Sequence, residues 1–193
     1  MNNDISKLRM RLDEIRNKIL KNEYDGLFIS IPQNVRQVLT GTSNSDFLNN
    51  VHGNSLAIES GISDVPGYLL ITKDRAIFAT YWYQFYLAHI EVLNRPNISI
   101  SSIGMTIDES INTKGKQEFP LVDIISISLD VKWLIDVFNQ SRITFLKWDG
   151  SFTSKNSWMS KNLLEELIRI QNQRKIFISP GLNFSELEFE KFS

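Results

Sequence analysis

The 193-residue chain has no cysteine and only two histidines, His52 and His89. Without cysteine it cannot form disulfide bonds or thiolate metal sites, and this composition is typical of proteins in a reducing cytoplasm. Its 21 basic and 22 acidic residues nearly cancel, so the chain has no strong field to attract nucleic acid or anionic lipid. It also lacks the run of about 18 apolar residues that a membrane span needs. We therefore expect a soluble, cytoplasmic protein that binds neither nucleic acid nor membranes.

Sequence motifs for nucleotide or metal binding are lacking as well. The chain has no Walker loop, no Gly-x-Gly-x-x-Gly fingerprint, no His-Glu-x-x-His zinc motif and no calcium-hand loop. We therefore predict no cofactor in this chain. The segment 41–45, "GTSNS", matches half of a nucleophile elbow but lacks its second glycine. A small hydrolase that uses Ser43 or His52 is one alternative that this match leaves open.

Helical and extended patterns alternate along the chain. Helices are expected at 4–21, at 32–39, at 82–89, in a segment ending near Asn139, and after a cap at Asn156 or Ser157. Strands are expected at 26–31, 68–72, 76–80, 90–94, 97–103, 142–148 and 175–179. Segments 40–66 and 104–118 are expected to be a long loop and an exposed connection, and Asp149-Gly150 a turn. Because a hairpin interrupts the alternation, we predict an α/β fold with a mixed β-sheet of about five to six strands flanked by helices.

Aromatic residues are crowded directly after the predicted hairpin. Five of the six positions from 81 to 86 are Tyr, Trp or Phe, which is too dense for one face of a helix or a strand. Such rings are most often core or interface anchors, because Tyr and Trp combine a large apolar area with a polar edge. The alternative is a free-standing small-molecule binding module in which these rings line a pocket.

The order of these elements resembles the N-terminal domain of the creatinase, Xaa-Pro aminopeptidase and prolidase family. The likeness covers most of residues 9–182. It is carried by Arg11-Leu12, Tyr24-Asp25-Gly26-Leu27, Asn34-Val35-Arg36, Leu39-Thr40-Gly41 and the hairpin "GYLLITKDRAIFAT". The chain departs from the family pattern at Val38 and Thr42, where aromatics are usual, and at 81–84, where an Asp-x-Arg-Tyr segment is usual. The resemblance implies a creatinase N-terminal-like fold with a ribonuclease H-like motif.

The resemblance also implies a function. Family members hold two divalent metal ions in a C-terminal catalytic domain that is absent from this chain, while the N-terminal domain supports oligomerisation and closes one side of the substrate cleft. We therefore expect residues 1–182 to form a non-catalytic domain and 183–193 a tail or the start of a linker. The expected partners are a second copy in a homodimer and a catalytic domain from an aminopeptidase-like or dipeptidase-like parent. The candidate binding or interface residues are Asn34, Arg36, Thr40, Gly41, His52, Tyr81, Trp82 and Tyr83.

Overall fold

The computed structural model describes residues 2–18, 23–40, 67–81, 105–106, 122–127, 130–153 and 159–183. Its helices are α1 (Asn2–Lys18), α2 (Pro32–Thr40), α6 (Lys132–Gln140) and α7 (Lys161–Asn172). Its strands are β1 (Gly26–Ile29), β2 (Gly67–Thr72), β3 (Ala76–Tyr81), β4 (Met105–Thr106), β5 (Asp123–Ile127), β6 (Phe145–Trp148) and β7 (Phe177–Ser179). The predicted helix 82–89 and strands 90–94 and 97–103 lie outside the described residues.

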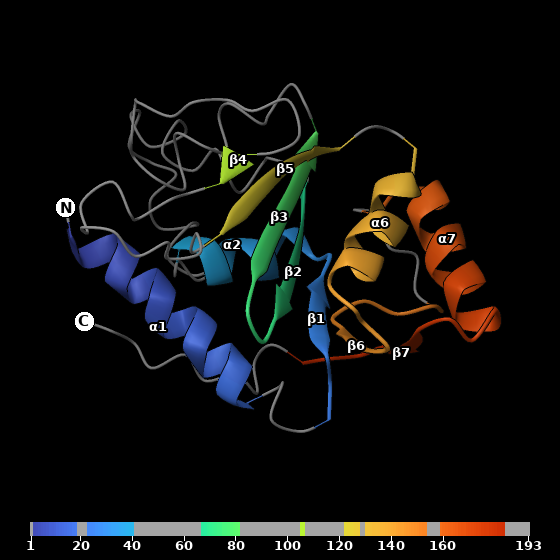
Figure 1. Ribbon diagram of the computed structural model, residues 1–193, viewed down its shortest axis with the longest axis horizontal. Coiled ribbons are helices and arrows are strands. Elements are labelled where there is room, and N and C mark those ends of the chain that lie inside the picture. The colour runs from blue at the N-terminus through green and yellow to red at the C-terminus, as the bar shows by residue number, and fades with distance from the viewer. Residues whose placement is uncertain are drawn as a thin grey trace.

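The strands form one mixed sheet in the order β4-β5-β3-β2-β1-β6-β7 (Figure 1). Strand β2 is antiparallel to both of its neighbours, whereas β1, β6 and β7 are mutually parallel and β5 is parallel to β3. Only the hairpin strand β2 and the short edge strand β4 run against the others. The predicted α/β class and mixed sheet are confirmed. The described sheet has seven strands, whereas about five to six were predicted.

Two strands beyond the hairpin, β4 and β5, were not predicted from the sequence. Strand β5 pairs in parallel with β3, and β4 pairs with β5 inside the segment predicted to be an exposed connection. Asp123 gives β5 a charged first residue, which weakens its strand pattern. In the fold, both Nε and Nη2 of Arg75 donate to Asp123 Oδ2, at 2.9 and 2.6 Å. The hairpin turn thus supplies the cation that pairs with this carboxylate.

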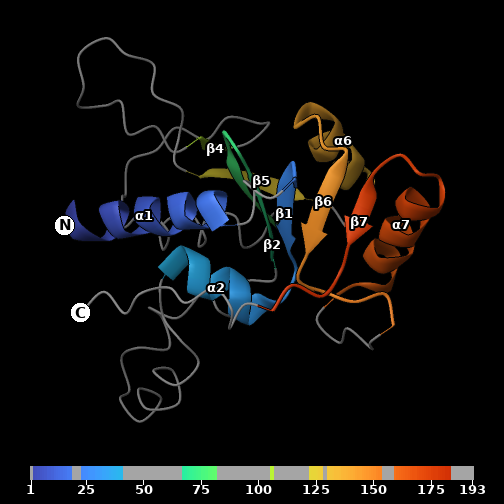
Figure 2. The ribbon, with the colours of Figure 1, turned by 90° about the horizontal axis from the view of Figure 1, so that it is seen from below.

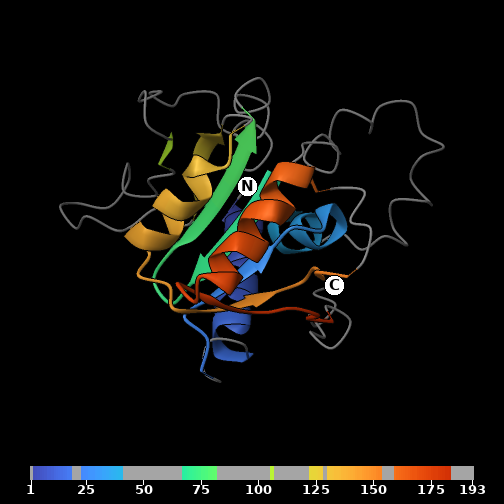
Figure 3. The ribbon, with the colours of Figure 1, turned by 90° about the vertical axis from the view of Figure 1, so that its right-hand side faces the viewer.

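Helices cover both faces of the sheet. Helices α1 and α2 lie on one side, and α6 and α7 lie on the other (Figure 2); the second pair runs side by side in Figure 3. Helix α1 buries Leu8, Leu12 and Ile15, which recur at helical spacing along one of its faces. In the described part of the chain, no helix has the length and apolar character needed to cross a membrane.

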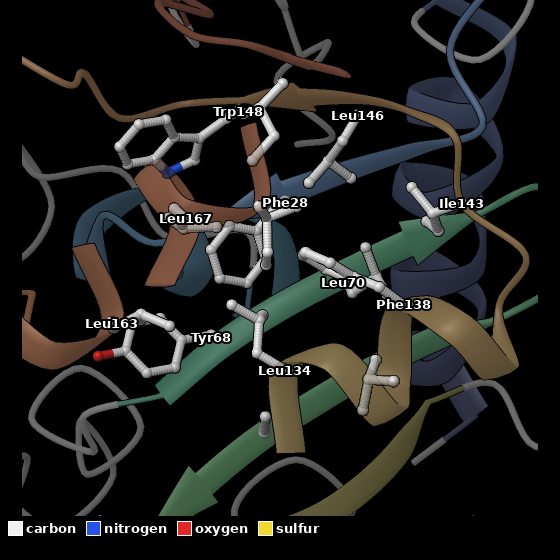
Figure 4. Close-up of a cluster of buried hydrophobic side chains, with 14 of the residues drawn as sticks. Phe28, Tyr68, Leu70, Leu134, Phe138, Ile143, Leu146, Trp148, Leu163 and Leu167 are labelled. Atoms are coloured by element: carbon white, nitrogen blue, oxygen red, sulfur yellow. The ribbon is translucent and has the colours of Figure 1, made fainter. Parts of the chain in front are cut away.

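The larger core lies between the sheet and the pair α6 and α7. Figure 4 shows Phe28 of β1 in the middle of this cluster, between Trp148 of β6 and Tyr68 of β2. Phe28 meets Phe138 of α6 edge-on at 5.8 Å between ring centroids. Burying a side chain of this size contributes about 1.5–3 kcal/mol. The same β1 strand buries Leu27 and Ile29 on its other face, so β1 is the centre of the fold.

The first residue of α7 differs from the prediction, and α6 and α7 end in the same motif. The cap of α7 is Ser160, whose side chain accepts a hydrogen bond from Leu163 N at 3.2 Å, and the prediction of Asn156 or Ser157 is wrong. Helices α6 and α7 both end with a left-handed residue, Arg142 at φ 53° and Arg174 at φ 51°. In both helices the next amide turns back to a carbonyl of the last turn. This is the Schellman motif, in which glycine is the usual left-handed residue.

Candidate functional site

Helix α2 begins where the adjacent parallel strands β1 and β6 end, and one carboxylate holds its start. Asp149 follows β6, and its Oδ1 accepts hydrogen bonds from the backbone N and the hydroxyl of Ser30, at 2.8 and 3.0 Å. Its Oδ2 accepts from Ile31 N at 3.1 Å and from Asn34 Nδ2 at 2.9 Å. Negative charge is favourable at a helix N-terminus, where the backbone N–H groups lack partners within the helix. Asp149 therefore joins the carboxyl end of β6 to the first turn of α2.

The hydrogen bonds around Ser30 have a defined direction. The indole Nε1 of Trp148 donates to Ser30 Oγ at 2.9 Å. An indole nitrogen can only donate, so Ser30 Oγ accepts this bond and directs its own proton to Asp149. All three side chains are buried, with at most 5% of each residue exposed. Trp148, Ser30 and Asp149 thus form a donor chain that ends on the carboxylate.

Burial and hydrogen bonding act in opposite directions on the pKa of Asp149. Burial raises its pKa above the ordinary value, because removal from water disfavours the charged form. The hydrogen bonds from Ser30, Asn34 and Ile31 limit that rise, because each of them stabilises the ionised carboxylate. The side chain is thus a desolvated acid whose acceptor positions are occupied by neighbouring donors.

Gly150 is required by the close approach of the Trp148 ring. A Cβ atom at residue 150 would lie 2.2 Å from Cζ2 and 2.3 Å from Cε2 of that indole. No side chain fits there unless the buried Trp148 moves. The backbone continues the connection, since Gly150 O accepts from Gly181 N at 2.9 Å. The predicted turn at Asp149-Gly150 therefore also serves the packing of Trp148, because Gly150 leaves room for the indole and Asp149 binds the same Ser30 hydroxyl.

An arginine holds the other end of α2. Arg11 of α1 donates from Nε to Val38 O at 2.7 Å and from Nη2 to Leu39 O at 3.0 Å. Carbonyl groups in the last turn of a helix lack partners within it, and a cation is favourable at that end. Arg11 is buried, with 6% exposed. Helix α2 is therefore held by a carboxylate at its start and by a guanidinium at its end.

The structure describes only some of the predicted site residues. Asn34, Arg36 and Thr40 lie on α2, and the side chain of Asn34 is part of the Asp149 network. Tyr81 is the last residue of β3 and pairs with Ile127 of β5. These two groups belong to different elements, α2 and β3. The other four predicted residues, Gly41, His52, Trp82 and Tyr83, lie outside the described residues.

Sequence reasoning missed Asp149, Ser30, Trp148 and the role of Arg11. One signal was present, because Asp149 is a charged residue placed directly after an apolar strand. Its partners are 115 to 119 residues away along the chain, however, so no local pattern reveals them. In the described part of the chain, no three side chains among His, Cys, Asp and Glu are grouped so that they could hold a metal ion.

Comparisons with known proteins identify the fold. The N-terminal domain of the cytoplasmic peptidase PepQ from Mycobacterium tuberculosis H37Rv superposes with a TM-score of 0.52 and 14% identity, over 92% of this chain and 97% of that chain. An Xaa-Pro aminopeptidase structure from Streptococcus pyogenes gives 0.51 and 15%, over 94% and 97%. No protein-family model and no curated protein matches the sequence. The chain thus has the creatinase-like N-terminal fold that its sequence predicts.

The same fold also occurs in a chain with a different description. The N-terminal domain of the FACT complex subunit SPT16 from Eremothecium gossypii superposes with a TM-score of 0.50 and 12% identity. The superposition covers 92% of this chain and 36% of that chain. The fold is therefore found in a peptidase domain and in a subunit of a multiprotein complex.

Proposed function

We propose that this chain is a non-catalytic N-terminal domain of a Xaa-Pro peptidase-like protein. The observation that carries the proposal is the Asp149 network. Ligands in open α/β sheets usually bind at the carboxyl ends of the strands, and here the carboxylate at that position binds Ser30, Ile31 and Asn34. Its hydrogen bonds build the start of a helix. The fold supports the same conclusion, since it matches a peptidase N-terminal domain over nearly the full chain.

Association and shaping of a substrate cleft are the proposed roles of this domain. Helix α2 is held at both ends by Asp149 and Arg11, so it offers a rigid support for the residues that follow it. We assign the contacts to Arg36 and Thr40 on α2, to Gly41 and His52 after it, and to the aromatic segment 81–83. The SPT16 likeness supports a role in assembly, because that protein is a subunit of a complex.

The proposed partners are a second copy of the chain and a catalytic domain located in the cytoplasm. The parent activity that we propose is aminopeptidase or dipeptidase cleavage at Xaa-Pro bonds, with two divalent metal ions held by that catalytic domain. Nothing in the proposal requires a metal ion in this chain. The domain would instead close one side of the cleft in which the partner binds its substrate.

Light scattering on a size-exclusion column tests the association role. We expect a molar mass that approaches twice the chain mass of 22.3 kDa as the concentration rises. Arg36→Ala and Trp82→Ala should shift the mass toward that of the monomer. Lys161→Ala is the matched control, because Lys161 is an exposed cation on the distant helix α7. A monomer at every concentration would contradict the homodimer, and equal masses for all variants would contradict the assignment of Arg36 and Trp82.

A further inference from the structure

Helices α1 and α2 cover one face of the sheet where it is formed by β1 and β2. On that same face, β6 and β7 carry exposed side chains. Leu146 and Ile178 point into the core beneath α6 and α7. Side chains alternate along a strand, so Phe145 and Phe177 project from the opposite face. Phe177 is 57% exposed, more than any other large apolar side chain in the described part of the chain. This part of the sheet thus presents apolar surface to solvent.

Three aromatic rings form a strip across the amino ends of β1, β6 and β7. The Phe145 ring lies 4.5 Å from that of Tyr24, which precedes β1, and 5.0 Å from that of Phe177, measured between centroids. The ammonium of Lys147 lies 5.7 Å from the centre of the Tyr24 ring. We call Tyr24, Phe145 and Phe177 the aromatic strip. It lies at the opposite end of these strands from Asp149 and helix α2.

Two arginines in left-handed conformations flank the aromatic strip. Arg142 and Arg174 occupy equivalent positions, each three residues before one of the paired residues Phe145 and Phe177. Both are exposed, and Lys175 follows the second. Glycine would adopt this conformation without strain. For arginine, part of the cost of the left-handed conformation is offset because a cation is favourable near a helix C-terminus. Strained conformations that persist often mark functional positions. At the two helix ends the residue is a cation, whereas Glu23, which precedes Tyr24 and has a φ of 91°, is acidic.

Acidic residues also lie near these cations. The hydrogen bond from Arg169 lowers the pKa of Glu166, and the nearby charge of Lys175 lowers it further. Asp25 Oδ2 accepts hydrogen bonds from the backbone N of Thr144 and Phe145, both at 2.9 Å. Its charge is thus directed at the start of β6. Glu23 is the other acidic residue beside Tyr24. Among the described residues, neither Arg142 nor Arg174 forms an ion pair. The surface therefore combines exposed aromatic area with the exposed charges of Arg142 and Arg174.

The neighbouring sheet edge is closed to strand addition. Strand β7 is the last in the sheet and has three residues. Its outward amide, Ile178 N, already donates to Oε1 of Gln171 on α7 at 2.6 Å. A partner that added a strand here would have to displace that bond. Contact at this surface is therefore made through side chains on the face of the sheet.

We propose that the aromatic strip with Arg142, Arg174 and Lys175 is a docking surface for an acidic polypeptide segment that carries apolar side chains. Apolar side chains of the partner would cover Phe177, and its carboxylates would pair with the two arginines. A single-stranded nucleic acid fits less well, because the Phe145 ring packs against both Tyr24 and Phe177, which leaves less ring face on which bases could stack. This surface is separate from α2, so the inference does not depend on the proposed function.

Fluorescence anisotropy with a labelled peptide tests this surface. The probe is the synthetic octapeptide Glu-Leu-Glu-Phe-Glu-Leu-Glu-Phe, titrated with the full chain. The control peptide has glutamine in place of each glutamate, and a labelled ten-nucleotide oligothymidylate tests the nucleic-acid alternative. We expect saturable binding of the acidic peptide that weakens as salt rises, and at least about fivefold weaker binding of the glutamine peptide. No saturable binding, equal binding of both peptides, or tighter binding of the oligonucleotide would overturn the proposal.

Four variants locate the contact. Arg142→Gly and Arg174→Gly each remove a cation and relieve the left-handed strain, so the fold is kept while affinity should fall about fivefold. Phe177→Ser should weaken binding by a similar factor or more. Ile168→Ser is the matched control, because Ile168 is an exposed apolar residue of α7 outside the strip, 37% exposed. Glycine variants that bind the peptide like the unchanged protein would show that the arginines serve only the helix ends, and would overturn the proposal.

Discussion

Asp149 is the residue on which the start of helix α2 depends. Replacing it with asparagine keeps the shape but leaves an amide NH₂ facing donors that need an acceptor, namely Ile31 N and Asn34 Nδ2. Unsatisfied buried donors are costly, so we predict that Asp149→Asn lowers the free energy of unfolding by about 2–3 kcal/mol. Urea titration followed by circular dichroism measures this. Asp136→Asn, at an exposed position of α6, should change the stability by less than about 0.5 kcal/mol; equal effects would refute the network.

Arg11 is the corresponding residue at the end of α2. Arg11→Met keeps much of the side-chain volume but leaves the carbonyls of Val38 and Leu39 without these donors. We predict a loss of about 2 kcal/mol, with partial recovery in Arg11→Lys, which keeps the charge but not the planar fork. Denaturant unfolding measures both. Arg169→Met removes an ion pair with Glu166 on the surface of α7 and should cost much less stability than Arg11→Met, because water screens surface ion pairs. A similar loss in both methionine variants would contradict the role of Arg11.

At the scale of single residues, the sequence predicted which side chains are buried more readily than which groups they bind. The inward residues of α1 follow from helical spacing, and Leu12 and Ile15 are fully buried. Asn34 was selected as a binding or interface residue, and the structure adds a role that was not predicted, because its amide donates to Asp149. Arg11 was noted only as part of a family pattern. The partners of both residues come from remote segments, and a single sequence carries no signal of such pairings.

The Schellman ends of α6 and α7 give a prediction at the scale of elements. Arg142 and Arg174 both have positive φ, which is unfavourable for a residue with a Cβ atom. Arg142→Gly and Arg174→Gly should each raise the free energy of unfolding by about 0.5–1 kcal/mol, after the larger backbone entropy of glycine in the unfolded chain is included. Arg9→Gly, inside helix α1, should instead lower it by about 1 kcal/mol. Lower stability in both end variants would contradict the strain described here.

Elements with a strong local pattern were predictable, and weakly patterned elements were not. Strand β1 is a continuous apolar run after a turn, and Pro32 marks the first residue of α2. Strand β5 was missed because Asp123 and Ser126 dilute its apolar pattern, and its place in the sheet depends on pairing with β3. Strand β4 has two residues, which is too short for any periodicity to identify.

For the whole molecule, Asp25 predicts how stability depends on pH. Partial burial raises the pKa of Asp25, but hydrogen bonds from Thr144 and Phe145, with the nearby charge of Lys73, outweigh it and lower the pKa. A carboxyl with a lowered folded pKa stabilises the fold above its unfolded pKa, and this contribution disappears as the pH falls through the folded value. The stability gap between the unchanged protein and Asp25→Asn should therefore be largest above about pH 4 and shrink below it.

Urea unfolding at several pH values checks this prediction. Asp13→Asn serves as the control, because Asp13 is an exposed carboxylate whose side chain is 56% exposed and whose ion pair with Arg16 lies on the helix surface. Its stability gap should stay small throughout. A gap for Asp25→Asn that grows on acidification would show that the carboxyl is not stabilised in its ionised form.

We propose that the carboxylate at the strand ends serves the fold and that the chain is a non-catalytic domain. The most direct measurement is the rate of Xaa-Pro dipeptide and tripeptide hydrolysis by the full chain with added Mn²⁺, Co²⁺ or Zn²⁺, for the unchanged protein and for Asp149→Asn. We expect no rate above the metal-only blank for either protein. A rate proportional to protein concentration that is lost in Asp149→Asn, while circular dichroism stays native, would contradict it.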